Sequence, residues 1–120
     1  MSIWSRMKSV FGGSDNFLSK TVAAATTLAV PDDMAVVPLT GTATVTSLTA
    51  PQHTRGRMVW LWQSDTGTTT LTNSPGTTTA GQMDLGGLDT SNAVLGPTDW
   101  IQLYLKSDGT WIRVMPVTNN

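Results

Sequence analysis

The side chains that could do chemistry are few and lie far apart in the sequence. His53 is the only histidine, and it lies in a Pro-Gln-His-Thr-Arg-Gly connector in a chain that has neither cysteine nor glutamate. A nucleophilic triad would require His53 to meet a serine and an aspartate in space, and no spacing in the sequence indicates such a meeting. We therefore predict that His53 is a solvated loop residue.

The aspartates are placed as turn residues. Asp32 and Asp33 directly follow Pro31, which is typical of a turn. The oxygen-bearing side chains between residues 84 and 92 lack the ordered spacing of a calcium loop. Two aspartates could in principle cleave a glycosidic bond, but nothing in the sequence pairs them at an identifiable site. We expect no catalytic residue, no metal and no cofactor, and hence no enzymatic activity.

Length and charge narrow the classes of function further. A chain of 120 residues is long enough for one domain, and its net charge of −1 with scattered basic residues argues against a nucleic-acid partner. No apolar run approaches the roughly 20 residues that span a bilayer, and the beginning lacks the apolar core of a signal peptide. Without cysteine the protein can be made in a reducing cytoplasm, and its stability must come from packing or oligomerisation.

Residues 1–20 differ in pattern from the rest and form a separate arm in our domain division, with the β domain at 21–120. Five apolar residues have the spacing of one helical stripe: Ile3, Trp4, Met7, Val10 and Phe11. Burial would contribute roughly 1.5–3 kcal/mol for each of these side chains, whereas ordering the backbone costs on the order of 1–2 kcal/mol per residue. The arm should therefore be ordered only when it is docked, either on its own domain or on a neighbouring polypeptide; a membrane is not expected.

From residue 22 onward the composition is that of an all-β domain. Threonine, valine and tryptophan are plentiful, and Pro, Gly, Asn and Asp separate short runs of strand-forming residues. We expect strands at 24–30, 34–39, 42–49, 57–63, 68–72, 82–85, 99–106 and 110–115. Their number and length predict an antiparallel β-sandwich or barrel, jelly-roll-like in form, with the amphipathic helical arm attached.

Two of these strands allow more detailed predictions. Asp-Gly at 108–109 indicates a two-residue hairpin turn that would place Leu105 opposite Ile112. One face of the hairpin would then be aliphatic, and the other would expose Tyr104, Lys106, Trp111 and Arg113.

The strand at 57–63 is apolar on both sides. Met58, Trp60 and Trp62 alternate with Val59 and Leu61, so both sides should be covered. One of the two sides is covered either by another subunit or by loops of the same chain. In the first case Met58, Trp60 and Trp62 are candidates for the subunit interface.

The order of several short motifs resembles a β domain that recurs in virion proteins of tailed phages. The motifs include Thr-Gly-Thr-Ala-Thr at 40–44, Arg-Gly-Arg at 55–57 leading into a Val-x-Leu strand, and Asp-Gly-Thr-Trp at 108–111, within a stretch of about residues 24–114. The family includes trimeric tail fibre and tailspike segments and trimeric capsid decoration, or cement, proteins. Its typical members carry Gly-Asp before the penultimate strand, whereas this chain has Gly-Pro-Thr-Asp at 96–99.

The resemblance implies a structural protein, because the shared motifs build the fold and include no catalytic residue. It implies a homotrimer on the capsid surface of a bacteriophage virion, bound to the major capsid protein, stabilising the head and made in the cytoplasm of the bacterial host. The family does not account for the arm, which we expect to dock on the capsid or another partner. The alternative is a tail fibre or baseplate component, or a carbohydrate-binding module, that contacts host glycans.

Overall fold

The computed structural model describes residues 21–86 and 91–118, and within them the protein is built from β-strands. The elements are β1 (Val22–Ala23), β2 (Thr27–Ala29), β3 (Val36–Thr40), β4 (Ala43–Val45), β5 (Ser47–Thr49), the 3-10 turn η1 (Gln52–Thr54), β6 (Arg57–Gln63), β7 (Thr69–Leu71), β8 (Met83–Asp84), β9 (Ala93–Leu95), β10 (Trp100–Leu105) and β11 (Trp111–Thr118). The all-β prediction is confirmed. The predicted helical arm falls in residues 1–20, outside the described residues.

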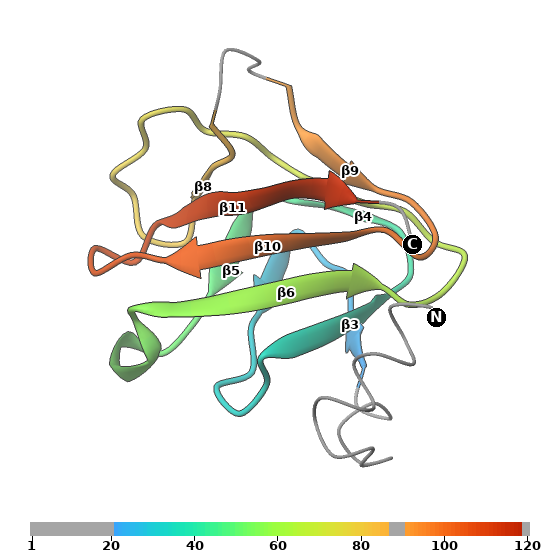
Figure 1. Ribbon diagram of the computed structural model, residues 1–120, viewed down its shortest axis with the longest axis horizontal. Helices are drawn as coiled ribbons and strands as arrows, with labels where there is room; N and C mark the ends of the chain where they lie inside the picture. Colours follow the sequence, from blue (N-terminus) through green and yellow to red (C-terminus); the bar gives the residue numbers. More distant parts are fainter. Residues whose placement is uncertain (1–20, 87–90, 119–120) are drawn as a thin grey trace.

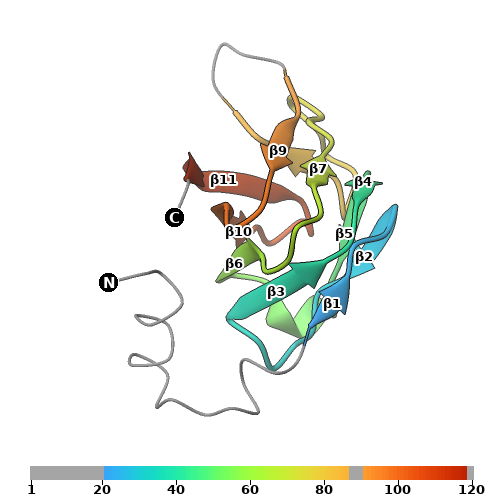
Figure 2. The ribbon, with the colours of Figure 1, turned by 90° about the vertical axis from the view of Figure 1, so that its right-hand side faces the viewer.

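The strands form three sheets around one interior. The largest has six strands in the order β1-β3-β6-β10-β11-β8, a second contains β4, β7 and β9, and a third contains β2 and β5. Figure 1 shows β3, β6, β10 and β11 side by side as one broad layer, and the turned view in Figure 2 shows the two smaller sheets on the other side of the interior.

Parallel pairing between successive windings of the chain distinguishes this fold from the sandwich or barrel that the sequence predicted. β1 pairs with β3, β3 with β6, β2 with β5 and β4 with β7, all in parallel. This is the arrangement of a β-solenoid, in which each bend carries the chain into the next sheet instead of reversing it within one sheet. The prediction of a jelly-roll-like sandwich or barrel was wrong. A turn rich in Gly or Thr can lead the chain into another sheet or reverse it within the same sheet, and which of the two occurs depends on pairing with strands distant in sequence. Among the described residues, antiparallel pairing joins β6 with β10, β10 with β11, and β7 with β9.

The interior is filled by aliphatic side chains from all three sheets. On β6, Val59 and Leu61 point inward and are fully buried, as the alternation of a strand requires. Leu48 on β5 and Leu71 on β7 belong to the same cluster. One hydrophobic core therefore holds the three sheets together.

Hydrogen bonds between two stacked corners of the solenoid complement this core. The buried Gln63 amide donates to the Gly41 carbonyl at 3.0 Å and to the Asp65 carboxylate at 2.7 Å, and its oxygen accepts a bond from the Thr69 hydroxyl. A Cβ on Gly67 would lie 2.1 Å from the Gly41 carbonyl oxygen, so this position requires glycine. The corner after β6 is thereby fixed against the corner after β3.

The C-terminal hairpin exists as predicted, but its register differs by one residue. Leu105 lies opposite Trp111 and Tyr104 opposite Ile112. The turn spans residues 106–110, because Lys106 N–H donates to the Thr110 carbonyl at 2.8 Å and the Asp108 carboxylate accepts from both the N–H and the hydroxyl of Thr110. A slip of one residue exchanges the two faces of a strand.

The predicted exposure of Trp111 was consequently wrong. Its side chain is fully buried, and its indole N–H donates to the Leu48 carbonyl at 2.9 Å. Ile112, which was expected beside Leu105 on the aliphatic face, is exposed, and so is Val114. Arg113 is exposed, as predicted, and it lies opposite Leu103. Lys106 lies in the turn and is partly exposed.

Candidate functional site

The most unusual surface of the molecule is the side of the six-stranded sheet that points away from the core, which we call the outward face. It is built from alternate residues of β3, β6, β10 and β11. On β6 these are Met58, Trp60 and Trp62, the three residues that the sequence identified as interface candidates. The structure therefore brings these three candidates together on one surface.

Strand pairing arranges the outward face in rows that cross the sheet. Val36, Trp60, Gln102 and Met115 are successive partners in one row, and Pro38, Trp62, Trp100 and Thr118 form the next. In a third row, Met58 lies opposite Tyr104, which in turn lies opposite Ile112. The apolar character of β6 thus continues onto both of its neighbours.

One end of this face is a cluster of indole rings, which we call the aromatic end. It contains Val36, Trp60, Trp62 and Trp100, in which Trp60 is half-buried and the other three are buried. The ring centroids of Trp60 and Trp100 are 4.4 Å apart with an angle of 35° between the planes, so the two rings are in tilted contact. Trp100 was not predicted as a member of this cluster, because its neighbours depend on the pairing of β10 with β6.

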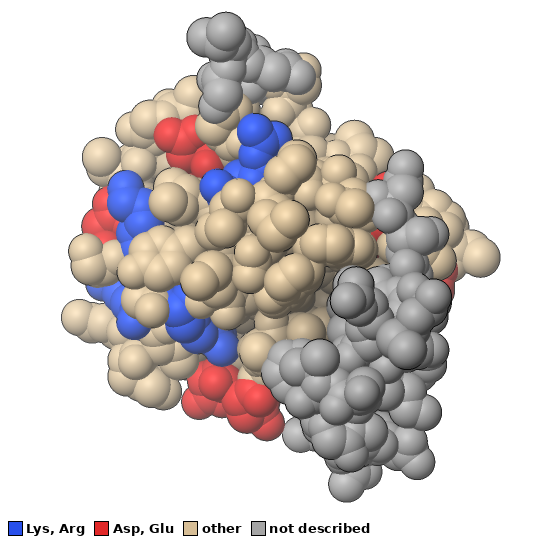
Figure 3. Space-filling model, in the orientation of Figure 1, with Lys and Arg blue, Asp and Glu red and all other residues tan. Residues whose placement is uncertain are grey.

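The other part of the face, the exposed margin, leaves large apolar side chains in solvent. Its members and their exposed fractions are Met58 (53%), Val114 (46%), Met115 (40%) and Ile112 (36%). Val94 on β9 is similarly exposed (52%) but belongs to a different sheet. Figure 3 shows that the centre of this side of the molecule is mostly uncharged, with Lys and Arg side chains towards its left-hand edge and in its upper part. A contiguous apolar area with a polar rim is typical of a surface that another molecule covers.

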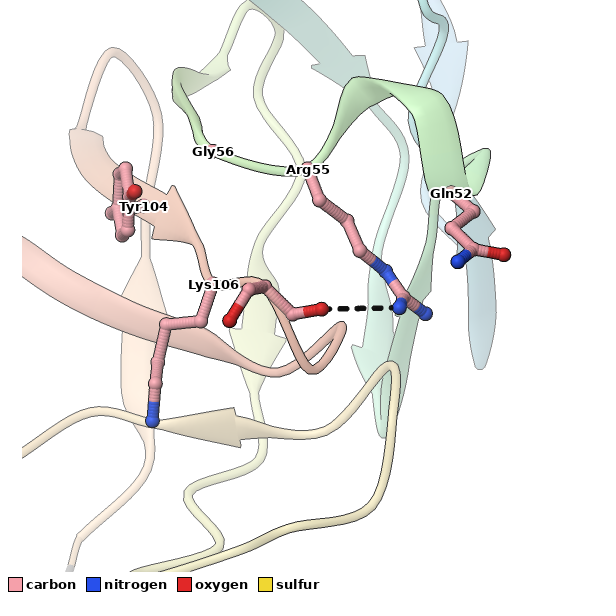
Figure 4. Close-up of a pocket in the computed structure, with 6 residues that line it drawn as sticks. Gln52, Arg55, Gly56, Tyr104 and Lys106 are labelled. Carbon is pink, nitrogen blue, oxygen red and sulfur yellow. Dashed lines mark hydrogen bonds between the residues drawn. The ribbon is translucent and has the colours of Figure 1, made fainter.

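A shallow cleft adjoins the exposed margin. It has a volume of about 480 Å³ and is lined by Gln52, Arg55, Gly56, Tyr104, Lys106 and Ser107. Figure 4 shows Arg55 extending from the segment before β6 towards the β10–β11 turn, where its guanidinium donates to the Ser107 carbonyl at 3.1 Å. Lys106 extends in a different direction. Of the residues predicted to share the exposed hairpin face, only Tyr104 and Lys106 line this cleft.

Arg57, at the start of β6, has a structural role beside the cleft. Its guanidinium donates to the carbonyls of Pro31 at 3.0 Å and Met34 at 3.2 Å, which fixes the turn before β3. Burial lowers the pKa of Arg57, and the nearby charge of Asp32 acts in the opposite direction. His53 and Asp32 approach to 3.6 Å, and both side chains are largely exposed. His53 is exposed to solvent, but it lies in the short 3-10 turn η1 and not in an irregular loop.

Two aspartates, Asp65 and Asp84, accept hydrogen bonds from backbone amides. Asp84 accepts from the N–H groups of Gly76 and Gly86, each at 3.0 Å, and Asp65 accepts from those of Gly41 and Gly67, each at 2.9 Å. These bonds lower the pKa of Asp65. Within residues 21–86 and 91–118 there is no group of three or more His, Cys, Asp or Glu placed to hold a metal ion.

The residues that the structure describes include no helix long and apolar enough to cross a membrane. The predicted docking stripe lies outside the described residues: Ile3, Trp4, Met7, Val10 and Phe11.

No protein-family model, curated protein or solved structure matches this chain.

Proposed function

We propose that this protein is a structural component of a phage virion, a capsid decoration protein that binds the major capsid protein as a homotrimer and stabilises the head. It has no catalytic role in this proposal, and acts through its surfaces. The observation that supports it best is the outward face, where the row that contains the exposed Met58 and Ile112 lies next to a cluster of tryptophans. The order of the chain's motifs, which resembles that of phage virion domains, supports the choice of partner.

The chemistry of the outward face suits permanent attachment to protein. Tryptophan and methionine are enriched where one protein covers another, and buried aromatic anchors carry much of the binding energy. Arg55 and Lys106 beside the apolar area supply a polar rim. A partner that covers the exposed margin would remove four large apolar side chains from water.

In a trimer, each subunit would need only a modest contact with the capsid for the whole assembly to bind tightly. Three copies on one rigid body engage the lattice together, and such avidity can raise affinity by about 10²–10⁴ without new types of contact. In this proposal the protein is made in the bacterial cytoplasm, where a cysteine-free chain needs no oxidising compartment, and it ends on the capsid surface.

Binding to heads tests the proposal directly. Heads that lack this chain, prepared from the phage that encodes it, are incubated with purified protein and sedimented. We expect the wild-type protein to be a trimer by light scattering and to saturate the heads. Met58→Asp should reduce binding at least tenfold, because it places a charge within the apolar face.

Val94→Asp is the matched control, since Val94 is as exposed as Met58 but lies on another sheet. It should bind as the wild type does, and circular dichroism should show both variants folded. If wild-type protein does not sediment with the heads, or if both variants bind equally well, the proposal fails.

A second candidate, contact with host glycans by a tail fibre, baseplate component or carbohydrate-binding module, is favoured by the cleft. Tyr104 offers a ring on which a sugar can stack, and Gln52 and Arg55 offer hydrogen-bond donors. A glycan array separates the two candidates. A capsid decoration protein should give no signal, whereas binding that Tyr104→Ala abolishes would favour the glycan candidate.

A further inference from the structure

The methionines of the described residues fall into two groups that differ in exposure. Met34 and Met83 belong to the hydrophobic core and are buried, with exposed fractions of 4% and 0%. Met58 and Met115 have exposed fractions of 53% and 40% and lie on the outward face. A reagent dissolved in water therefore reaches the side chains of the second pair, whereas the core shields those of the first.

The two exposed methionines lie on opposite sides of β10 within the exposed margin. Met58 on β6 pairs with Tyr104 of β10, and Met115 on β11 pairs with Gln102 of the same strand. They are therefore two strands apart, about 10 Å across the sheet, and one row apart, about 7 Å along it. A change in the polarity of both side chains would alter the apolar surface on either side of β10.

Oxidation by a peroxide makes such a change at a thioether. The sulfur lone pair attacks one oxygen of hydrogen peroxide, so that a sulfur–oxygen bond forms, the oxygen–oxygen bond breaks, and the products are a sulfoxide and water. Methionine sulfoxide reductases reverse the step, with two thiols supplying the electrons and the oxygen leaving as water. The sulfoxide is polar and hydrogen-bonds to water, so covering it with an apolar partner is unfavourable.

We propose that Met58 and Met115 form a peroxide-sensitive modification site, at which reversible oxidation makes the exposed margin polar and prevents it from binding a partner. The fold should tolerate this oxidation, because both side chains are already largely in water. A partner that covers the margin would also shield the two sulfur atoms from peroxide. The selective oxidation follows from exposure alone, whereas the loss of binding to heads rests on the proposed function.

Treatment of the purified protein with hydrogen peroxide tests the modification site without phage heads. Peptide mass spectrometry follows oxidation at each methionine, and we expect positions 58 and 115 to react at least tenfold faster than positions 34 and 83. The oxidised protein should keep its circular dichroism spectrum and be retained less on a hydrophobic-interaction column. Met58→Leu combined with Met115→Leu should show less than half of this shift. Equal rates at the four positions, or equal shifts, would overturn the proposal.

Sedimentation with phage heads then tests the effect on binding. Oxidised wild-type protein should bind at least tenfold more weakly than untreated protein, and methionine sulfoxide reductases should restore its binding. The oxidised double variant should bind as its own untreated form does.

Adding Val94→Met to the double variant provides the matched control, because it places a thioether at an equally exposed position on another sheet. Oxidation there should leave binding to heads unchanged. Undiminished binding of the oxidised wild type, or an equal loss in the double variant, would overturn the proposal. If untreated wild-type protein does not bind heads, the proposed function fails, and the oxidation rates and column retention decide on the modification site.

Discussion

The two sides of β6 differ in what covers them. On the inner side, Val59 and Leu61 are fully buried by strands of all three sheets. On the outer side, Trp62 is buried, Trp60 is half-buried and Met58 is more than half exposed. The residues on both sides of β6 are apolar, so hydrophobicity alone does not predict which side the rest of the chain covers. The exposed end of the outer side therefore takes no part in filling the core.

The largest effect that separates the two sides should come from Leu61→Ala. Truncating a fully buried leucine removes transfer free energy and leaves a cavity, and we expect the free energy of unfolding to fall by about 2–5 kcal/mol. Urea denaturation followed by circular dichroism measures this loss. A decrease below about 1 kcal/mol would show that the interior is not packed as described.

Trp111→Phe should have the next largest effect, and it tests the register of the hairpin. The variant removes the indole N–H that bonds the Leu48 carbonyl and leaves a small void, so we expect a loss of about 1–3 kcal/mol. In the register predicted from the sequence Trp111 would be exposed, and the same change would then cost almost nothing. Thermal unfolding distinguishes the two cases.

The corner at Asp65 should make stability depend on acid. Hydrogen bonds from Gly41, Gly67 and Gln63 hold the pKa of Asp65 below its usual range. A carboxyl with a lowered pKa in the folded state contributes stability above its unfolded pKa of about 3.9, and this contribution is lost as pH falls towards the folded value.

Asp65→Asn should therefore lower stability at neutral pH and flatten the decline below about pH 4. Denaturant midpoints measured at pH 7 and across pH 2–5 check both effects. An unchanged acid profile in the variant would show that the Asp65 bonds do not stabilise the fold.

The smallest effect should come from Met58→Ala, on the outer side of the same strand. Its side chain is largely solvated already, so we expect a change within about 0.5 kcal/mol. Paired with Leu61→Ala under identical conditions, it measures the difference between the two sides directly. A loss as large as that of Leu61→Ala would mean that Met58 belongs to the core.

Strands with a strong local pattern could be predicted from the sequence. β6 occupies Arg57–Gln63, the range expected from its unbroken apolar run. The expected strand at 42–49 is divided into β4 and β5, on different sheets, because the chain bends at Thr46. β1 and β9 were missed, since two or three residues rich in alanine and valine carry little periodicity.

Pairing could not be predicted from the sequence, because it depends on residues far apart in the chain. Nothing local to Val36 specifies that it lies beside Trp60. The hairpin register depends on the hydrogen bonds that Asp108 accepts from Thr110. These bonds stabilise a turn that is longer than the two-residue turn predicted from Asp-Gly. The candidate site could be predicted only in part. Its residues on β6 follow from the alternation along that strand, whereas Trp100 joins them only through the pairing of distant strands.

Solvent accessibility of position 58 tests most directly whether the outward face is covered in an assembly. Met58→Cys and Val94→Cys proteins are labelled with a maleimide reagent, first free in solution and then bound to phage heads. Both positions are about equally exposed in the isolated chain, so both should react at similar rates there. On heads, we expect labelling of the first to slow at least tenfold and that of the second to stay unchanged. Equal rates at both positions in the bound state would contradict the account.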